Sequence, residues 1–129
     1  MNSDSKDSKK KRTVGFNYAA RGLKKTALTE RNFQIQLCAA ALTLIVAALL
    51  QLSAVEWIII IMVIGLVLAL EVVNTAIERL LDYLSPEFHP LAGAVKDISA
   101  GAVLLAVIVA LLVAMIIFLP KINAFLFYI

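Results

Sequence analysis

Four polar residues near the middle of this sequence have types and a spacing that suit phosphate chemistry. Glu71, Asn74, Glu78 and Asp82 directly follow an uncharged apolar run. On a helix that turns about 100° per residue, the three acids and Thr75 fall within roughly 60° of one another, and Asn74 lies at the margin. Carboxylate and amide oxygens are the hard ligands that suit Mg²⁺ held against phosphates. The pattern therefore indicates one polar stripe, which we call the acidic stripe, with a capacity for metal and phosphate binding.

Three charged residues outside the stripe are expected at the same membrane face. Glu30 precedes the first apolar run, and Lys96 and Asp97 open the third. A lysine can contact a polyphosphate, whereas Asp97 near a helix N-terminus can equally well be explained by the helix dipole. The whole set fits phosphoryl transfer, in which positioning and charge neutralisation lower the barrier. The GxxxxGK[ST] and GxGxxG loops of soluble nucleotide-binding enzymes are absent from the sequence.

The apolar runs that carry these residues predict an all-α integral membrane protein. Hydrophobic residues make up 62% of the chain, and residues 32–55 and 98–120 are free of charge. Each of these runs exceeds the roughly 20 residues that cross a bilayer. The middle run, residues 57–70, is too short, but its extension through Ile77 gives about 31 Å of helix. This second span therefore requires Glu71 and Asn74 to lie inside the membrane.

The segments around the spans are expected to be a tail, a surface helix and a short C-terminal extension. Phe16, Ala20, Leu23 and Ala27 repeat at helical spacing, which is typical of an amphipathic helix in the membrane interface. Pro86 and Pro90 predict that the second span ends near Leu84. The expected segments are a disordered basic tail (1–12), a surface helix (13–30), spans at about 33–51, 56–84 and 96–119 within one domain (13–122), and a C-terminal tail (123–129).

The distribution of basic residues predicts the orientation in the membrane. Nine of the twelve Lys and Arg residues precede residue 32, and the loop at 51–57 has none. Because cytoplasmic loops carry an excess of Lys and Arg, we expect a cytoplasmic N-terminus and an external C-terminus.

The acidic stripe has three other interpretations. Asn74 and Thr75 can hydrogen-bond between helices, with Glu78 paired to Arg79 or Lys96, as a purely structural contact. A small transporter or channel-like oligomer can use acids as an ion pathway, but acids are then expected deep in the bilayer and on more than one helix. A noncatalytic accessory subunit is the third alternative. An unpaired membrane carboxylate costs about 2.5–3.5 kcal/mol on insertion scales, so several acids on one stripe favour a functional role.

Three segments of the sequence resemble one known family. "EVVNTAIERLLD", with "TERNFQ" upstream and "HPLAGAVKDISAGAV" downstream, is similar to the small integral-membrane diacylglycerol kinases, and the likeness runs from about Phe16 to Ile122. "EW" ahead of the second span and the ending "IIFLPK" resemble the undecaprenol kinases of Gram-positive bacteria within that family. Enzymes of the bacterial diacylglycerol branch typically have an acid where Gln36 stands here.

The resemblance implies a homotrimer in the bacterial plasma membrane that transfers the γ-phosphate of ATP, with Mg²⁺, to a lipid hydroxyl. It implies that Glu71 is the general base and that Asn74 orients the reacting groups. Undecaprenol is the expected lipid and diacylglycerol the alternative; nucleic acid is not an expected partner. The remaining roles implied are Mg²⁺ binding by Glu30 and Glu78, phosphate contact by Lys96, and support of the nucleotide by Asp82 and Asp97.

Overall fold

The computed structural model describes residues 4–87 and 89–127, with side chains described from residue 15 onward. This part of the chain forms helices and short connections and contains no strand. The helices are α1 (Asp4–Thr29), α2 (Arg31–Leu49), α3 (Ala54–Leu84) and α4 (Pro90–Phe127). Three of them, α2, α3 and α4, are long and apolar enough to cross a membrane. The expected all-α fold with three spanning helices is confirmed.

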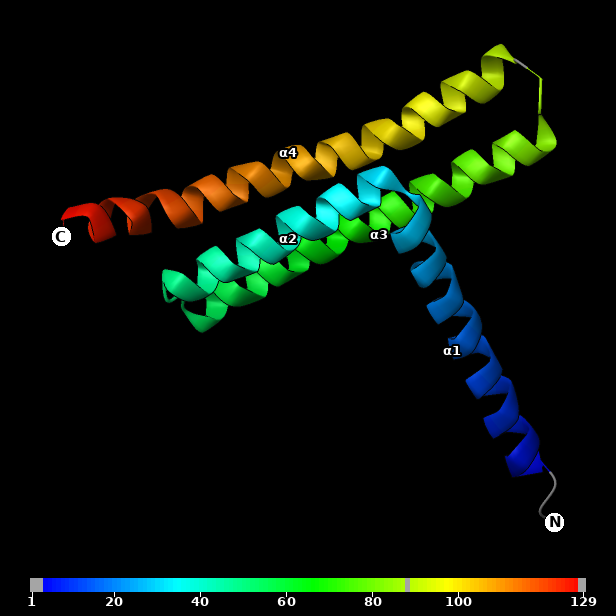
Figure 1. Cartoon of the computed structure of the whole chain (residues 1–129), viewed down its shortest axis with the longest axis horizontal. Coiled ribbons are helices and arrows are strands. Elements are labelled where there is room, and N and C mark those ends of the chain that lie inside the picture. The colour runs from blue at the N-terminus through cyan, green and yellow to red at the C-terminus, as the bar shows by residue number, and fades with distance from the viewer. Residues whose placement is uncertain (1–3, 88, 128–129) are drawn as a thin grey trace.

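Helix α3 is the centre of the molecule, because both α2 and α4 pack against it. The chain reverses between α2 and α3 and again between α3 and α4, as Figure 1 shows. The beginning of α2, the end of α3 and the beginning of α4 therefore lie toward one end of the bundle. Helix α1 leaves the bundle from this same end and projects away from its axis (Figure 1). We call it the α1 end, and the opposite one the turn end.

Local sequence signals explain where the central helix begins and ends. The Ser53 side chain accepts from the backbone N–H of Glu56, and the Glu56 carboxylate accepts from the backbone N–H of Ser53, which makes a capping box at the start of α3. Helix α3 ends at Leu84, directly before Ser85 and Pro86, as the sequence predicted. Pro90 is the first residue of α4, a position where its missing N–H costs nothing.

A buried apolar cluster lies at the turn end of the bundle. Ala47, Leu52, Ile60 and Ile117 form a buried cluster that joins α2, α3 and α4. Elsewhere, many large apolar side chains are exposed, including Leu104 at 61%. Such exposure along spanning helices suits contact with lipid or with further protein, because neither requires a polar surface.

Two helices extend farther than the sequence suggested. Helix α1 begins at Asp4, so residues that we expected in a disordered tail are helical, and Lys and Arg are indeed good helix formers. Residues 1–3 lie outside the described residues. Helix α4 begins six residues before the expected span (96 − 90 = 6) and continues past Pro120 to Phe127. Residues 128–129, the end of the expected C-terminal tail, are not described.

The early start of α4 removes one explanation for Asp97. The first turn of α4 contains no acidic residue, and Asp97 lies seven residues after Pro90. The helix dipole acts mainly within the first turn. The interpretation of Asp97 as a helix-capping acid is therefore wrong, because the helix starts too early.

Helix α1 packs on the bundle only near its C-terminal end. Thr26 is buried, whereas Phe16 and Leu23 are 74% and 52% exposed. Of the expected amphipathic face, Phe16, Ala20 and Leu23 are thus exposed, and Ala27 is half-buried. The placement of α1 in the membrane interface stays a prediction.

Candidate functional site

The acidic stripe lies on α3 and its first part is buried. Glu71, Asn74 and Thr75 are each 4–5% exposed, and they directly follow a long apolar stretch of the same helix. A buried carboxylate or amide is costly unless it has hydrogen-bond partners. The surroundings of these side chains therefore decide what the stripe can do.

Glu71 has its partner on α2. The Gln36 side chain donates from Nε2 to Glu71 Oε2 at 2.8 Å, which links two helices across 35 residues of sequence. Among the described residues, Gln36 Oε1 is buried and has no hydrogen-bond partner. A buried polar atom without a partner costs about 1–3 kcal/mol, so this oxygen marks a place where a donor is missing.

Asn74 connects α3 to α4. Its Nδ2 donates to Glu78 Oε1 at 3.0 Å, one turn along the same helix. Its Oδ1 accepts from the hydroxyl of Ser99 on α4. The interhelical hydrogen bond expected for Asn74 in the structural interpretation is therefore present, and the same amide also orients the carboxylate of Glu78.

Glu30 lies between α1 and α2 and is held by α3. Arg79 forms an ion pair with the Glu30 carboxylate and donates to the Thr29 hydroxyl at 2.7 Å. The hydrogen bond from Arg79 is the main reason that the pKa of Glu30 lies below its ordinary value, and the bond from Thr29 acts in the same direction. This pair brings Glu30 beside the C-terminal part of α3, where Glu78 precedes Arg79.

Lys96 forms an ion pair at the α1 end of the bundle. Its ammonium group contacts the carboxylate of Asp82, which joins α4 to the last part of the acidic stripe. The two side chains are 36% and 65% exposed, so they are accessible to a soluble nucleotide. Asp97 is exposed, and its side chain takes part in no hydrogen bond or ion pair among the described residues. The structure thus brings Lys96 and Asp82 together but leaves Asp97 apart.

The residues expected to bind Mg²⁺ form no complete cage by themselves. No group of three or more His, Cys, Asp or Glu side chains suited to a metal occurs in the described part of the chain. Mg²⁺ usually takes one or two protein carboxylates together with phosphate oxygens and water. Glu30 and Glu78 fit that requirement in chemistry, with the condition that Arg79 releases Glu30.

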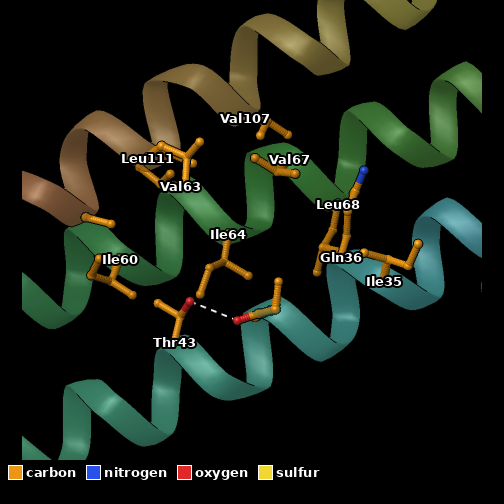
Figure 2. Close-up of a pocket in the computed structure, with 14 residues that line it drawn as sticks. Ile35, Gln36, Thr43, Ile60, Val63, Ile64, Val67, Leu68, Val107 and Leu111 are labelled. Carbon is orange, nitrogen blue, oxygen red and sulfur yellow. Dashed lines mark hydrogen bonds between the residues drawn. The ribbon is translucent and has the colours of Figure 1, made fainter.

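A cavity of about 280 Å³ adjoins Gln36 on the side facing the turn end. Figure 2 shows that side chains from all three spanning helices line it, with Ile35 and Thr43 on α2, Ile64 on α3 and Val107 on α4. The lining is aliphatic apart from Gln36 and Thr43. Val67, which lines the cavity, is one helical turn from Glu71. Gln36 therefore lines one end of this apolar cavity, and its amide is bonded to Glu71.

Sequence reasoning missed several partners in this layer. Glu78 is bonded by Asn74, and neither Arg79 nor Lys96 pairs with it in the described structure, contrary to the structural interpretation. Ser99 received no role, although a hydroxyl three residues after Lys96 lies on nearly the same face of a helix. The pairing of Arg79 with Glu30 has no sequence signal, because it depends on how two separate helices meet.

The chain is similar to proteins of one family. The family described as prokaryotic diacylglycerol kinase matches residues 17–118. An undecaprenol kinase of Bacillus subtilis is 46% identical over 106 residues, which cover 82% of this chain and 86% of that protein. A diacylglycerol kinase of Synechocystis is 38% identical over 108 residues (83% and 62%), and one of Escherichia coli K12 is 34% identical over 95 residues (74% and 78%). The chain belongs to the prokaryotic diacylglycerol kinase family.

Proposed function

We propose that this chain transfers the γ-phosphoryl group of ATP to the hydroxyl of a membrane lipid alcohol, and that the alcohol is undecaprenol. One observation carries the proposal: the buried carboxylate of Glu71 is held by Gln36 at the end of an aliphatic cavity inside a membrane-spanning bundle. The 46% identity to a protein named undecaprenol kinase supports the choice of lipid. Diacylglycerol remains the second candidate, because other relatives are named for it.

In the proposed reaction Glu71 acts as the general base. Its carboxylate takes the proton of the lipid hydroxyl while the lipid oxygen forms a bond to the γ-phosphorus. The bond from that phosphorus to the β–γ bridging oxygen breaks, and ADP leaves with the electron pair. Asn74, held by Ser99, orients the reacting groups next to this base. General-base catalysis of this kind contributes about 10²–10⁴ in rate.

The exposed charges of the same layer suit the nucleotide. Lys96 would exchange Asp82 for the phosphates of ATP, and Asp82 and Asp97 would support nucleotide binding. Glu30 and Glu78 would hold Mg²⁺ against those phosphates. The ion, when bound, neutralises negative charge on the triphosphate, which is the main requirement in phosphoryl transfer. Arg79 would then have to release at least one oxygen of the Glu30 carboxylate.

The aliphatic cavity suits the hydrocarbon part of the substrate. Its lining from Ile35, Ile64 and Val107 offers dispersion contacts and few polar groups. An alcohol that stays in the bilayer would enter from the lipid and present its hydroxyl at Gln36 and Glu71. The soluble nucleotide would approach the same point from the aqueous side.

We further propose a homotrimer in the bacterial plasma membrane, with the kinase unit at residues 13–122, a cytoplasmic N-terminus and an external C-terminus. The basic residues before position 32 support this orientation. The exposed apolar faces of α4, with Leu105 and Leu112 at 64% and 50%, support contacts with lipid and with further copies.

The test is a lipid panel with the purified full chain in a bilayer and labelled ATP. We expect phosphate transfer to undecaprenol in preference to diacylglycerol, and loss of transfer when Mg²⁺ is chelated. Wide preference for diacylglycerol would overturn the choice of lipid. Phosphorylation of neither lipid would overturn the proposed function, and full turnover in excess chelator would contradict the Mg²⁺ assignment.

A further inference from the structure

Arg79 is a cation at the α1 end of the bundle that uses only part of its hydrogen-bonding capacity. Its Nη2 contacts the carboxylate of Glu30 and donates to the Thr29 hydroxyl at 2.7 Å. A guanidinium group also has an Nε hydrogen and two Nη1 hydrogens, and in Arg79 these donate to no protein atom among the described residues. The Arg79 side chain is 39% exposed. The ion pair therefore leaves donors unused on a side chain that water reaches.

The proposed metal ligands place Arg79 beside the phosphates of the nucleotide. Arg79 contacts Glu30 at the junction of α1 and α2, which lies beside α3 (Figure 1), and Glu78 precedes Arg79 in the sequence. Glu30 and Glu78 are proposed to hold Mg²⁺, and in phosphoryl transfer this ion bridges the β- and γ-phosphate oxygens. Phosphates at that position have to lie close to both carboxylates. They are therefore within reach of the long side chain of Arg79.

The charges around Arg79 also favour contact with a phosphate. The acids of this layer include Glu30, Glu78 and Asp82, whereas Arg79 and Lys96 are cations that each pair with one of these acids. A triphosphate is highly negative, so carboxylates repel it unless cations lie against it. Exposed ion pairs contribute little to stability, so an arginine exchanges a carboxylate for a phosphate at little cost. The planar fork of an arginine matches phosphate oxygens in a bidentate arrangement.

We propose that Arg79 binds the terminal phosphate of ATP and exchanges its contact with Glu30 for this phosphate when the nucleotide binds. The inference rests on the proposed function and adds a residue to its nucleotide site. Arg79 lies three residues (82 − 79 = 3), or about 4.5 Å of helix, closer to Glu71 than Asp82, the partner of Lys96. The phosphate that approaches the proposed base is the one that is transferred. Arg79 therefore takes the γ-phosphate, and Lys96 takes phosphates farther from the lipid.

Three substitutions separate phosphate binding from a purely structural ion pair. Arg79→Gln removes the charge and the fork. Arg79→Lys keeps the charge, and with it the attraction to Glu30, but lacks the fork. Arg31→Gln is the matched control, because Arg31 is an exposed arginine at the first position of α2 and follows Glu30 in the sequence. None of the ion pairs among the described residues involves Arg31.

The measurement is the dissociation constant of the nucleotide, with the purified full chain in a bilayer that contains no lipid alcohol. The probes are β,γ-methylene-ATP, which cannot transfer its terminal phosphate, and ADP, both with Mg²⁺. We expect Arg79→Gln to weaken binding of the ATP analogue about 10–100-fold, the loss of hydrogen bonds to a charged group, and to weaken ADP far less. Arg79→Lys should lose less affinity for the analogue than Arg79→Gln. Arg31→Gln should bind both nucleotides as the wild type does.

The exchange of partners has a separate readout in excess chelator, where Glu30 holds no metal. Glu30→Gln then releases Arg79 from its partner, so this variant should bind the metal-free analogue more tightly than the wild type. Removal of a negative charge contributes to the gain on its own. A double-mutant cycle with Arg79→Gln isolates the contribution of Arg79. The gain from Glu30→Gln should be smaller when Arg79 is already replaced, and an equal gain in both backgrounds would reject the exchange.

Other results would overturn the inference while leaving the kinase function intact. An equal loss of affinity for the analogue and for ADP in Arg79→Gln would reject the contact with the terminal phosphate. The same loss in Arg31→Gln would show a general attraction of charge. If Arg79→Gln does not fold, Arg79→Lys decides, and unchanged affinity for the analogue in that variant rejects the inference. A wild-type chain that binds neither nucleotide would instead reject the proposed function.

Discussion

Two glutamates of helix α3, Glu56 and Glu71, lie toward opposite ends of the bundle and have different surroundings. Glu56 lies in the first turn of α3 at the turn end, where it accepts from the backbone N–H and the hydroxyl of Ser53 at 2.7 and 2.8 Å. Lys121 adds an ion pair at 3.1 Å. Glu71 lies seventeen residues into the same helix (71 − 54 = 17), is 4% exposed, and is bonded by one amide from another helix.

This difference separates a structural acid from a candidate catalytic one. The carboxylate of Glu56 has a backbone donor, a hydroxyl and a cation, and its position in the first turn also favours the helix dipole. The hydrogen bonds and the ion pair of Glu56 are thus all made within the protein, and they need no ligand. Glu71 has no such helix-end role. The amide that holds it belongs to a residue lining an apolar cavity, and the amide oxygen has no partner among the described residues. The missing interaction, more than the presence of an acid, indicates the site.

The largest expected effect is the loss of activity when Glu71 is neutralised. Glu71→Gln keeps the shape and a hydrogen-bond acceptor but removes the base, so we expect lipid phosphorylation to fall about 10²–10⁴-fold. The matched Glu56→Gln should retain activity close to that of the wild type. The assay is transfer of labelled phosphate to the lipid, with size-exclusion chromatography to show that both variants keep the assembly.

Two outcomes would break the contrast between these acids. Full activity of Glu71→Gln in an intact assembly would remove Glu71 as the base and would favour an accessory role for the chain. Equal loss of activity in both variants would mean that each substitution lowers activity by disturbing the structure, since Glu56 has no contact with the proposed substrate.

The elements around the site follow from the sequence more readily than the contacts within it. The apolar runs predicted three spanning helices, and the prolines at 86 and 90 predicted the end of α3 at Leu84. The spacing of Glu71, Asn74 and Glu78 on one helix predicted a shared face, and the bond between Asn74 and Glu78 agrees with that spacing. Periodicity within one helix was sufficient for these inferences.

Contacts between helices required the structure. Gln36 meets Glu71 across 35 residues, and Arg79 meets Glu30 across 49. Which side chains face one another depends on the rotation and depth of each helix in the bundle, and hydrophobic periodicity defines neither for helices that are apolar on all sides. Gln36 was noted for its amino-acid type alone, and its role as the partner of Glu71 was not predicted.

A smaller effect is expected from the cap that holds Glu56. Ser53→Ala removes the hydroxyl from the capping box, and loss of a helix N-cap costs about 0.5–2 kcal/mol of stability. Ser85→Ala is a control at the other end of α3, because the Ser85 hydroxyl makes only a 3.3 Å contact with the backbone oxygen of Glu87. Unfolding in mixed micelles would measure both variants. A loss of lipid phosphorylation in folded Ser53→Ala would contradict the view that the turn end has a structural role alone.

The smallest effect concerns the pair of Glu30 and Arg79, which fastens the α1–α2 junction to α3. Arg79 lowers the pKa of Glu30 below the ordinary 4.5, so the carboxylate binds protons less readily in the folded chain than in the unfolded one. The stabilisation is therefore fully present above about pH 4.5 and is lost as the pH falls through the lower folded-state pKa. The side chains are 29% and 39% exposed, and exposed pairs contribute about 0.2–1 kcal/mol. The protection factors of the junction amides, which are corrected for the intrinsic pH dependence of exchange, should fall slightly in acid. In Arg79→Gln they should already be lower at neutral pH and fall less on acidification. An equal fall of the protection factors in the wild type and the variant would show that another group controls this junction.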